Sequence, residues 1–303
     1  MRLDLALIAR HPGLSRRKAR EAIEKGQVTV DGRMVREPGR LVASREAAIV
    51  WDPHKKALSR VRSALRILYE DDAVVVVDKP AGLLSVPSGP GAEHEETALA
   101  HVREYVGRAR PRRTYVGLVH RIDRDTSGAL VFAKSKEARE AMIALVSRHG
   151  MERRYSALVA GHLARDEGVV DAPIRDAYEG GRRGVARGEE PSRPARTRFR
   201  VVERFADAAL LDVELETGRQ HQVRIHLAHI GVPVLGDARY GQGTRLPRLR
   251  VPRQMLHARR LAFTHPLTGG KVEVECPLPE DFEAALRALR ARPATRDSRK
   301  GRP

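Results

Sequence analysis

The first fifty residues space their apolar and polar positions in a way that predicts two helices followed by a β-hairpin. Apolar residues at 3–8 predict a short helix, and Ser15 stands where it can cap a second one. This second helix would bury three residues spaced at i, i+3 and i+4, which are Ala19, Ala22 and Ile23. The alternating apolar positions of Val28–Val35 surround the turn pair Asp31–Gly32, so this segment predicts the hairpin.

A polar, basic stretch at 51–66 interrupts the apolar pattern, and we interpret it as a linker to a larger domain. After it, the apolar run Val74–Val77 predicts a buried strand that ends near Pro80 and Gly82. A helix is expected next, because three apolar residues recur on one face, namely Ala98, Val102 and Val106.

The most polar loop of this domain lies between two apolar segments at 114–135. Its core, His120–Asp125, holds one histidine, two arginines and two aspartates. Polar groups gathered between buried strands are typical of an active-site loop or of a turn whose groups bond one another. Spacing alone leaves both interpretations open. A catalytic triad built on Ser127 is disfavoured, because Ser127 lies outside a nucleophile-elbow pattern.

A second polar cluster follows at 217–241, where the pattern predicts a helix over Gln220–His229. Val223 and Leu227 would face inward on this helix, with Gln220 and Arg224 together on a neighbouring face. The helix and its start also carry the histidines His221, His226 and His229. Their spacings of five and three residues cannot put all three on one helical face, so no metal site is expected there.

Charge is unevenly distributed along the chain. Fifty-seven basic residues outnumber 39 acidic ones, for a net charge of +18. Residues 1–66 hold 16 basic and 7 acidic side chains, a surplus of nine in about a fifth of the chain. A concentrated basic module beside a nearly balanced domain is typical of an enzyme with a polyanion-binding attachment.

Within the basic module, four cations crowd the start of the second predicted helix. They are Arg16, Arg17, Lys18 and Arg20. Cations are unfavourable at the positive end of a helix dipole by roughly 0.3–1 kcal/mol each when exposed. Contacts with phosphate groups would more than offset this cost, so these side chains are candidates for RNA binding. A merely solvated basic face is the alternative.

Length and composition exclude several classes of protein. The 303 residues, 41% of them hydrophobic, suffice for about two domains with sizeable cores. The longest aliphatic runs, such as Ala73–Val77, are far shorter than the ~20 residues of a membrane span. The N-terminus shows no signal-peptide pattern, and the single Cys276 cannot form an internal disulfide. We therefore expect a cytoplasmic protein without a membrane partner.

Ordered motifs at 67–280 resemble those of the RluA-type pseudouridine synthases. His120–Gly128 resembles the central motif of this family, with Ile122 where the family usually has leucine. Asp78–Gly82 resembles the first motif, Arg154–Gly161 the second, and Gly218–His226 with the following Gly236–Gly241 the third. Independently, residues 1–50 resemble the S4 RNA-binding module.

The resemblance implies an α+β fold with four parts. A small S4 (α-L type) RNA-binding domain at 1–50 and a linker at 51–66 would precede a pseudouridine synthase domain at 67–290 with a mixed, largely antiparallel sheet. A basic disordered tail at 291–303 would follow. The implied activity is that of an isomerase, an intramolecular transferase that converts specific uridines of RNA into pseudouridine without cofactor or metal. Domain order resembles the members acting on large-subunit ribosomal RNA. Transfer RNA is the alternative substrate, and a monomer is the family habit.

The resemblance also implies roles for individual residues. Asp123 matches the catalytic aspartate, and Arg224 the buried cation that keeps it ionised. Tyr155 would stack on the uracil and take part in later proton transfer. Arg121 would replace the flipped-out nucleotide in the RNA.

Ile225 and His120 complete the expected site, Ile225 as a lining of the base pocket and His120 as a structural hydrogen-bonding group. Two alternatives stay open: Arg219 as the partner of Asp123 in place of Arg224, and Tyr155 as a core residue only. An RNA-binding assembly factor that has lost catalysis is the rival function. Retention of Asp123, Tyr155 and Arg224 together argues against that rival.

Overall fold

The computed structural model describes most of the chain. The described residues are 1–24, 27–31, 33–35, 38–42, 48–52, 65–89, 92, 95–109, 115–176, 182–241, 246 and 249–291. The chain divides into two compact units, one with residues Met1–Ala64 and Pro87–Glu96, the other with Leu65–Val86 and Thr97–Pro303. No helix in the described ranges is long and apolar enough to cross a membrane.

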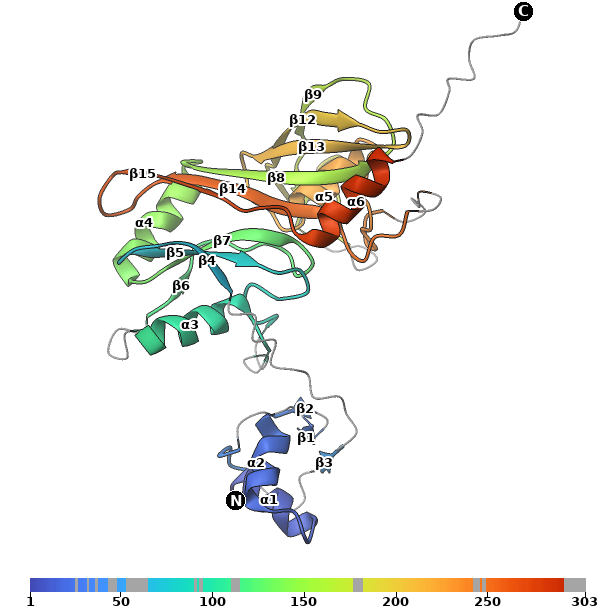
Figure 1. Ribbon diagram of the computed structural model, residues 1–303. Coiled ribbons are helices and arrows are strands. Elements are labelled where there is room, and N and C mark those ends of the chain that lie inside the picture. The colour runs from blue at the N-terminus through green and yellow to red at the C-terminus, as the bar shows by residue number, and fades with distance from the viewer. Residues whose placement is uncertain are drawn as a thin grey trace, which may run out of the picture. The chain divides into compact units, whose positions relative to one another are not determined.

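The N-terminal unit packs two helices against a small sheet (Figure 1). Its elements are α1 (Leu3–Arg10), α2 (Arg16–Glu24), β1 (Val28–Val30), β2 (Arg33–Met34) and β3 (Ile49–Trp51), with β1 central and antiparallel to both other strands. As the spacing predicts, the Ser15 side chain accepts a hydrogen bond from the backbone of Lys18 at the start of α2. The predicted stripe is buried together with Leu3 and Leu7 of α1 and Val28 of β1.

The expected linker is shorter at both ends than the sequence indicates. Trp51 belongs to β3 and pairs with Val28, and Arg66 belongs to a strand of the second unit and pairs with Asp78. Apolar–polar alternation is short at both places, so hydrogen bonding across the sheet was not visible in the pattern. Residues 53–64 of the linker and 292–303 of the expected tail lie outside the described residues.

The second unit is built on one mixed, largely antiparallel sheet, as the predicted fold class requires. Its strands are β4 (Arg66–Glu70), β5 (Val74–Lys79), β6 (Gly117–Leu118), β7 (Ser127–Ala133), β8 (Met151–Ala160), β9 (Glu167–Asp171), β12 (Arg196–Arg204), β13 (Ala208–Leu215), β14 (Leu256–Thr264) and β15 (Lys271–Glu275). The main path runs β4-β5-β7-β14-β8-β13-β12-β9. Within the described strands, the pairing of β7 with β14 is parallel and the other pairings are antiparallel.

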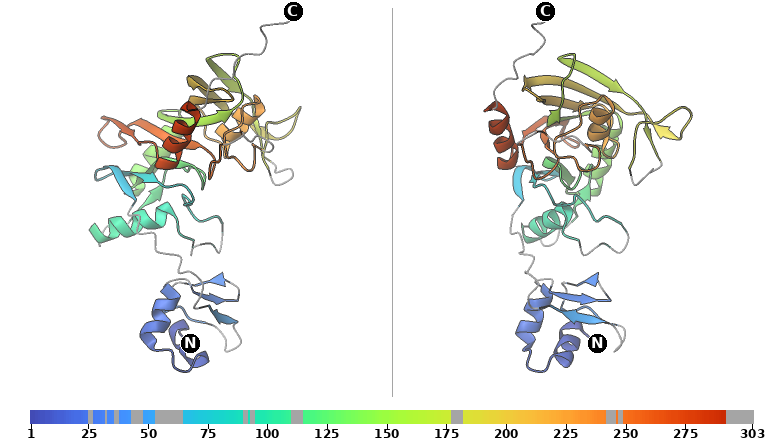
Figure 2. Two further views of the ribbon diagram at one scale, coloured as in Figure 1. Left: turned by 45° about the vertical axis from the view of Figure 1, so that its right-hand side comes forward. Right: turned by 90° about the vertical axis from the view of Figure 1, so that its right-hand side faces the viewer.

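Four helices and a short two-stranded ribbon complete the unit. The helices are α3 (Ala98–Ala109), α4 (Lys136–Ser147), α5 (Gln222–His229) and α6 (Glu280–Arg290), and the ribbon pairs β10 (Ile174–Arg175) with β11 (Ser192–Arg193). The right-hand view of Figure 2 shows α6 in red on one side of the sheet and α5 in orange on the other.

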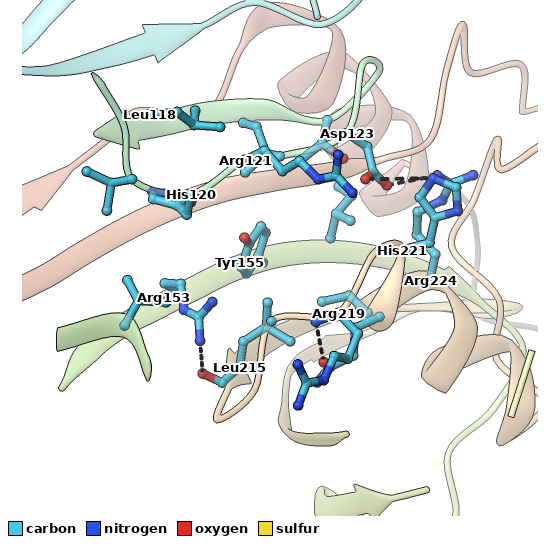
Figure 3. A pocket seen from close by; sticks show the side chains of 18 residues that line it. Leu118, His120, Arg121, Asp123, Arg153, Tyr155, Leu215, Arg219, His221 and Arg224 are labelled. Atoms are coloured by element: carbon cyan, nitrogen blue, oxygen red, sulfur yellow. Dashed lines mark hydrogen bonds and ion pairs between the residues drawn. The ribbon is translucent and has the colours of Figure 1, made fainter. Parts of the chain in front are cut away.

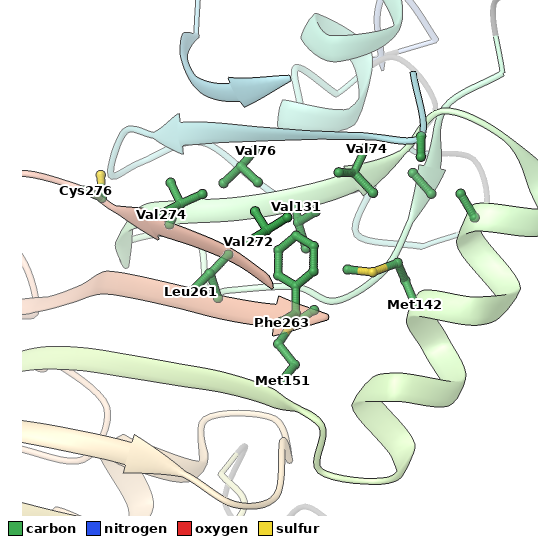
Figure 4. Close-up of a cluster of buried hydrophobic side chains, with 14 residues drawn as sticks. Val74, Val76, Val131, Met142, Met151, Leu261, Phe263, Val272, Val274 and Cys276 are labelled. Carbon is green, nitrogen blue, oxygen red and sulfur yellow. The ribbon is translucent and has the colours of Figure 1, made fainter. Parts of the chain in front are cut away.

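The sheet is buried on both faces because its strands alternate between two cores. Val74 and Val76 of β5 pack with Met142 of α4, in the cluster drawn in Figure 4, whereas Val75 and Val77 pack in the cluster that includes α3. This two-sided burial explains why the sequence of β5 is continuously apolar and not alternating.

Strand β14 joins two halves of the sheet that come from different parts of the chain. On one side it pairs with β7 and on the other with β8. The loop before β7 and the helix after β13 are consequently brought to the same face of the sheet, where α5 packs on β8 and β14. The candidate site lies between them.

Candidate active site

A cavity of about 310 Å³ opens between the predicted polar loop, strand β8 and the start of α5. Asp123, His221 and Arg224 gather at one end, and His120 and Arg153 at the other, with Tyr155 between them (Figure 3). The two polar clusters that the sequence singled out therefore form one site, although Asp123 and Arg224 are 101 positions apart.

Arg224 connects two carboxylates. Its Nη1 donates a hydrogen bond to Asp123 Oδ2 at 2.8 Å. Its Nε and Nη2 donate to Asp237 at 2.6 and 2.9 Å. The Arg224 and Asp237 side chains are buried, whereas Asp123 keeps 22% of its side chain exposed. Asp123 is thus the carboxylate that a molecule in the cavity can reach.

Electrostatics keep Arg224 and Asp237 ionised. Burial alone would lower the pKa of the Arg224 guanidinium, but the hydrogen bonds and charges of Asp237 and Asp123 outweigh burial and raise it. Burial would likewise raise the pKa of Asp237, and Arg224 together with backbone N–H groups lowers it instead. No role was predicted for Asp237 from the sequence, although Gly236–Asp237 belongs to the third motif.

His221 lies near the second carboxylate oxygen of Asp123. Its Nε2 is 3.9 Å from Asp123 Oδ1, and its Nδ1 shares a 2.9 Å hydrogen bond with the hydroxyl of Tyr240. Burial lowers the pKa of His221, which favours the neutral ring. His221 adopts a left-handed backbone with φ 60°, so α5 begins at Gln222. The prediction that Gln220 shares a helical face with Arg224 is therefore wrong.

Tyr155 is both a core residue and a wall of the cavity. It is 6% exposed and packs among the apolar residues under α5, yet its ring lies along the cavity (Figure 3). Burial raises the pKa of its hydroxyl to about 12, so the hydroxyl stays protonated at neutral pH.

Two other expected residues are placed differently. Arg219 is the wrong alternative for the partner of Asp123, because its Nε donates to the backbone oxygen of Pro194 at 3.0 Å. Ile225 is not among the residues that line the cavity; it is buried with Ile174 and Ala195. Consecutive residues of a helix point about 100° apart, so Val223 and Arg224 face the cavity and Ile225 turns away from it.

Arg121 and His120 line the cavity as predicted, but the expected structural hydrogen bond of His120 is not found among the residues that the structure describes. Arg121 is exposed at the cavity. The Nε2 atom of His120 is buried and has no partner in the described part of the protein. Arg153, two residues before Tyr155, also lines the cavity and was not singled out from the sequence. Strand alternation could have found it, since Arg153 and Tyr155 share a face of β8.

The catalytic triad considered for Ser127 lacks its third group among the described residues. Ser127 Oγ lies 2.9 Å from His257 Nδ1, but the other ring nitrogen of His257 bonds the backbone oxygen of Cys276, where a triad would need a carboxylate. Among the residues with described positions, no three His, Cys, Asp or Glu side chains are grouped to hold a metal ion.

The four cations of α2 in the N-terminal unit are exposed, but they are not equivalent. Arg16 lies 3.5 Å from the buried carboxylate of Asp4 and Arg17 lies 3.8 Å from Glu21. The buried Asp4 therefore offsets part of the cost of placing Arg16 at the helix start.

Known proteins resemble both units. Residues 73–229 match the RNA pseudouridylate synthase family, and residues 1–46 match the S4 domain. The chain is 38% identical to ribosomal large subunit pseudouridine synthase D of Nitrosomonas europaea, over 99% of this chain and 87% of that protein. It is 37% identical to the protein of the same name from Pseudomonas aeruginosa, over 95% of this chain and 92% of that one. The structure of human RNA pseudouridylate synthase domain containing 4 superposes with a TM-score of 0.63 at 25% identity, over 74% of this chain and 92% of that one.

Proposed function

The chain belongs to the RNA pseudouridylate synthase family, and on that premise we propose that it isomerises specific uridines of large-subunit ribosomal RNA with Asp123 as its catalytic carboxylate. The reaction breaks the bond between C1′ of the ribose and N1 of the uracil. The uracil then turns while bound, and its C5 forms a new bond to C1′. Atoms and electrons balance within the nucleotide, so the reaction needs no external oxidant or reductant.

The observation that carries this proposal is the pairing of Asp123 with Arg224 at the cavity wall. A carboxylate that acts beside the ribose, as a nucleophile or as a base, must be ionised in a site that excludes water. Arg224 supplies a fixed counter-charge, and Asp237 holds the guanidinium in place from behind. This hydrogen bond uses Oδ2 of Asp123 and leaves Oδ1 for the substrate.

Tyr155 and Arg121 would hold the RNA in place for this step. The buried Tyr155 ring offers a flat surface on which the uracil can stack. Reaching the cavity requires the nucleotide to leave its helix, at a cost of a few kcal/mol of unstacking. The exposed Arg121 is placed to fill the space that the flipped nucleotide leaves.

Two features support ribosomal RNA over transfer RNA as the substrate. Both bacterial relatives described above are named ribosomal large subunit pseudouridine synthase D. In addition, the N-terminal unit matches the S4 domain and carries the exposed cations of α2. We assign residues 1–50 to RNA binding and 67–290 to catalysis, in a monomer that acts in the cytoplasm.

A pseudouridine map of total RNA from cells with and without the gene tests this proposal, with carbodiimide-dependent stops as the readout. We expect sites in large-subunit ribosomal RNA to be lost and to return when the wild-type gene is restored. Losses confined to transfer RNA would overturn the substrate. Loss of no site, in cells without a redundant enzyme, would instead favour an RNA-binding assembly factor.

A further inference from the structure

Arg153 is a buried cation without an acidic partner among the described residues. It is 5% exposed, and its Nη2 donates a long hydrogen bond of 3.5 Å to the backbone oxygen of Leu215. Its Nε is buried and has no partner, and no described carboxylate forms an ion pair with it. Buried arginines are normally paired, because an uncompensated buried charge is costly. This cost needs an explanation.

The chain makes room for this guanidinium next to the cavity. A Cβ atom at Gly218 would lie 2.4 Å from Arg153 Nη1, so any larger residue there would push the guanidinium aside. Gly218 and Arg153 both line the cavity, and Figure 3 shows Arg153 at the end away from Asp123. The position of Arg153 is therefore built into two elements, strand β8 and the loop before α5.

His120 adds a second unpartnered group at this end. Its Nε2 is buried without a hydrogen-bond partner among the described residues. Burial and the charge of Arg153 lower the pKa of His120 to about 3, so the ring is neutral at physiological pH. A neutral imidazole can donate at one nitrogen and accept at the other, whereas a guanidinium only donates.

We propose that Arg153, together with His120, is a specificity-determining residue that reads the carbonyl edge of the uracil. This inference rests on the proposed function, because it requires the ribose at Asp123 and the base stacked on Tyr155. The far edge of the base then meets the donors of Arg153. A phosphate group would not reach this buried end, since the RNA backbone would stay at the mouth of the cavity.

The chemistry of the two pyrimidines makes this contact selective. Uracil presents a carbonyl oxygen at C4, which accepts a hydrogen bond from Arg153. Cytosine presents an amino group there, so two sets of donors would face each other in a buried site. A site that hydrogen-bonds a particular group of its substrate strongly rejects an analogue without that group. An apolar pocket discriminates between similar molecules far more weakly. A cation without an acidic partner keeps its donors free for the base.

The test uses a short RNA containing a uridine that the wild-type protein modifies, and the same RNA with cytidine at that position as a competitor. We expect Arg153→Met to lower kcat/KM for the uridine RNA by roughly 10- to 100-fold, mainly through KM. Inhibition by the cytidine RNA should change little, so the preference for uridine falls by about tenfold or more. Gly218→Ala should reduce the preference in the same direction, because it displaces the guanidinium.

Arg154→Met is the matched control. Arg154 is the next residue of β8, bonds Glu152 and Asp212, and lies outside the cavity lining. Arg153→Lys keeps the charge and serves if Arg153→Met does not fold. An unchanged preference for uridine in the folded Arg153 and Gly218 variants would overturn the role of Arg153 even if kcat fell. A wild-type protein that modifies no RNA at all would overturn the proposed function itself.

Discussion

Arg224 gives two of its three hydrogen-bonding nitrogens to Asp237, a residue that the cavity does not expose. The same carboxylate also accepts hydrogen bonds from the backbone of Arg239 and Tyr240 through Oδ1. Asp237 therefore connects the turn that follows α5 to the Arg224 guanidinium. The direction in which Arg224 faces Asp123 depends on a residue that cannot itself touch the substrate.

Asp237→Asn should accordingly lower both activity and stability. An amide can accept only at its oxygen, and its NH2 group would oppose the guanidinium. Breaking a buried ion pair costs on the order of 3–5 kcal/mol, and we expect a loss toward the lower end because Asn keeps one acceptor. Urea unfolding and kcat measure the two effects. Asp212→Asn is the control: it weakens the partly buried pair with Arg154 outside the cavity lining and should lower stability alone.

Asp123→Asn should abolish isomerisation and leave RNA affinity nearly unchanged, because the amide is neither a nucleophile nor a base and fills the same volume. The measurement pairs a pseudouridine assay with equilibrium binding to the substrate RNA. Asp125→Asn, an exposed position in the same loop, should retain activity. Turnover by the Asp123 variant would remove the carboxylate from its proposed role.

Lys79→Met should destabilise the second unit and reduce turnover. The buried Nζ of Lys79 donates to the backbone oxygens of Pro80, Leu83 and Arg124 at 2.7–2.9 Å. Each buried acceptor left unpaired costs about 1–3 kcal/mol, so a total loss of about 3 kcal/mol or more is expected. Arg124 follows Asp123 directly, so kcat should fall as well. Lys136→Met on the exposed start of α4 should change neither quantity.

Stability should decline as the pH falls below about 6.5. Between about pH 3 and pH 6.5 the His120 ring is neutral in the folded protein but binds a proton in the unfolded chain. Because the unfolded state binds more protons there, the free energy of unfolding rises with pH across this window. His120→Asn should flatten the slope by up to about 1.4 kcal/mol per pH unit, measured by urea unfolding from pH 4.5 to 6.5. An identical slope in the variant would show that His120 is protonated in the folded state.

The cations of α2 should set the salt dependence of RNA binding. Changing Arg17, Lys18 and Arg20 together to glutamine should weaken affinity and reduce the slope of log Kd against log salt by roughly 2–3, about 0.9 per lost phosphate contact for a duplex. Arg16 is left intact because it lies beside the buried Asp4. Deletion of residues 1–52 should have at least the same effect. An unaltered slope in both proteins would contradict phosphate binding by this helix.

Elements with a strong period were predictable from the sequence. The buried stripe of α2 and the strand β5 lie where their spacing placed them, because each buries the apolar face that defines the pattern. The resemblance to a known family chose Arg224 over Arg219 as the neighbour of Asp123, and the 2.8 Å contact agrees.

The features that the sequence did not predict depend on where a helix begins and on contacts between distant segments of the chain. The left-handed His221 delays the start of α5, so Gln220 falls outside the helix. Ile225 faces away from the cavity because it follows Arg224 on the helix and points about 100° from it. In the sequence Asp237 resembles an ordinary turn residue, and only the folded structure shows its hydrogen bond with Arg224. Arg153 lies two residues before Tyr155. An arginine at an inward strand position indicates a functional role only when its contact residues are known.

Strand β14 has a consequence for how the enzyme is made. Residues up to about 250 already contain Asp123, Tyr155 and Arg224, yet the strand that holds the two half-sheets together begins at Leu256. A chain emerging from the ribosome therefore carries every proposed catalytic group before it has an assembled site. Pairings between segments so far apart form slowly, because loop closure must precede the contacts that reward it. A protein proposed to act on ribosomal RNA would therefore gain an assembled site only after β14 has been synthesised.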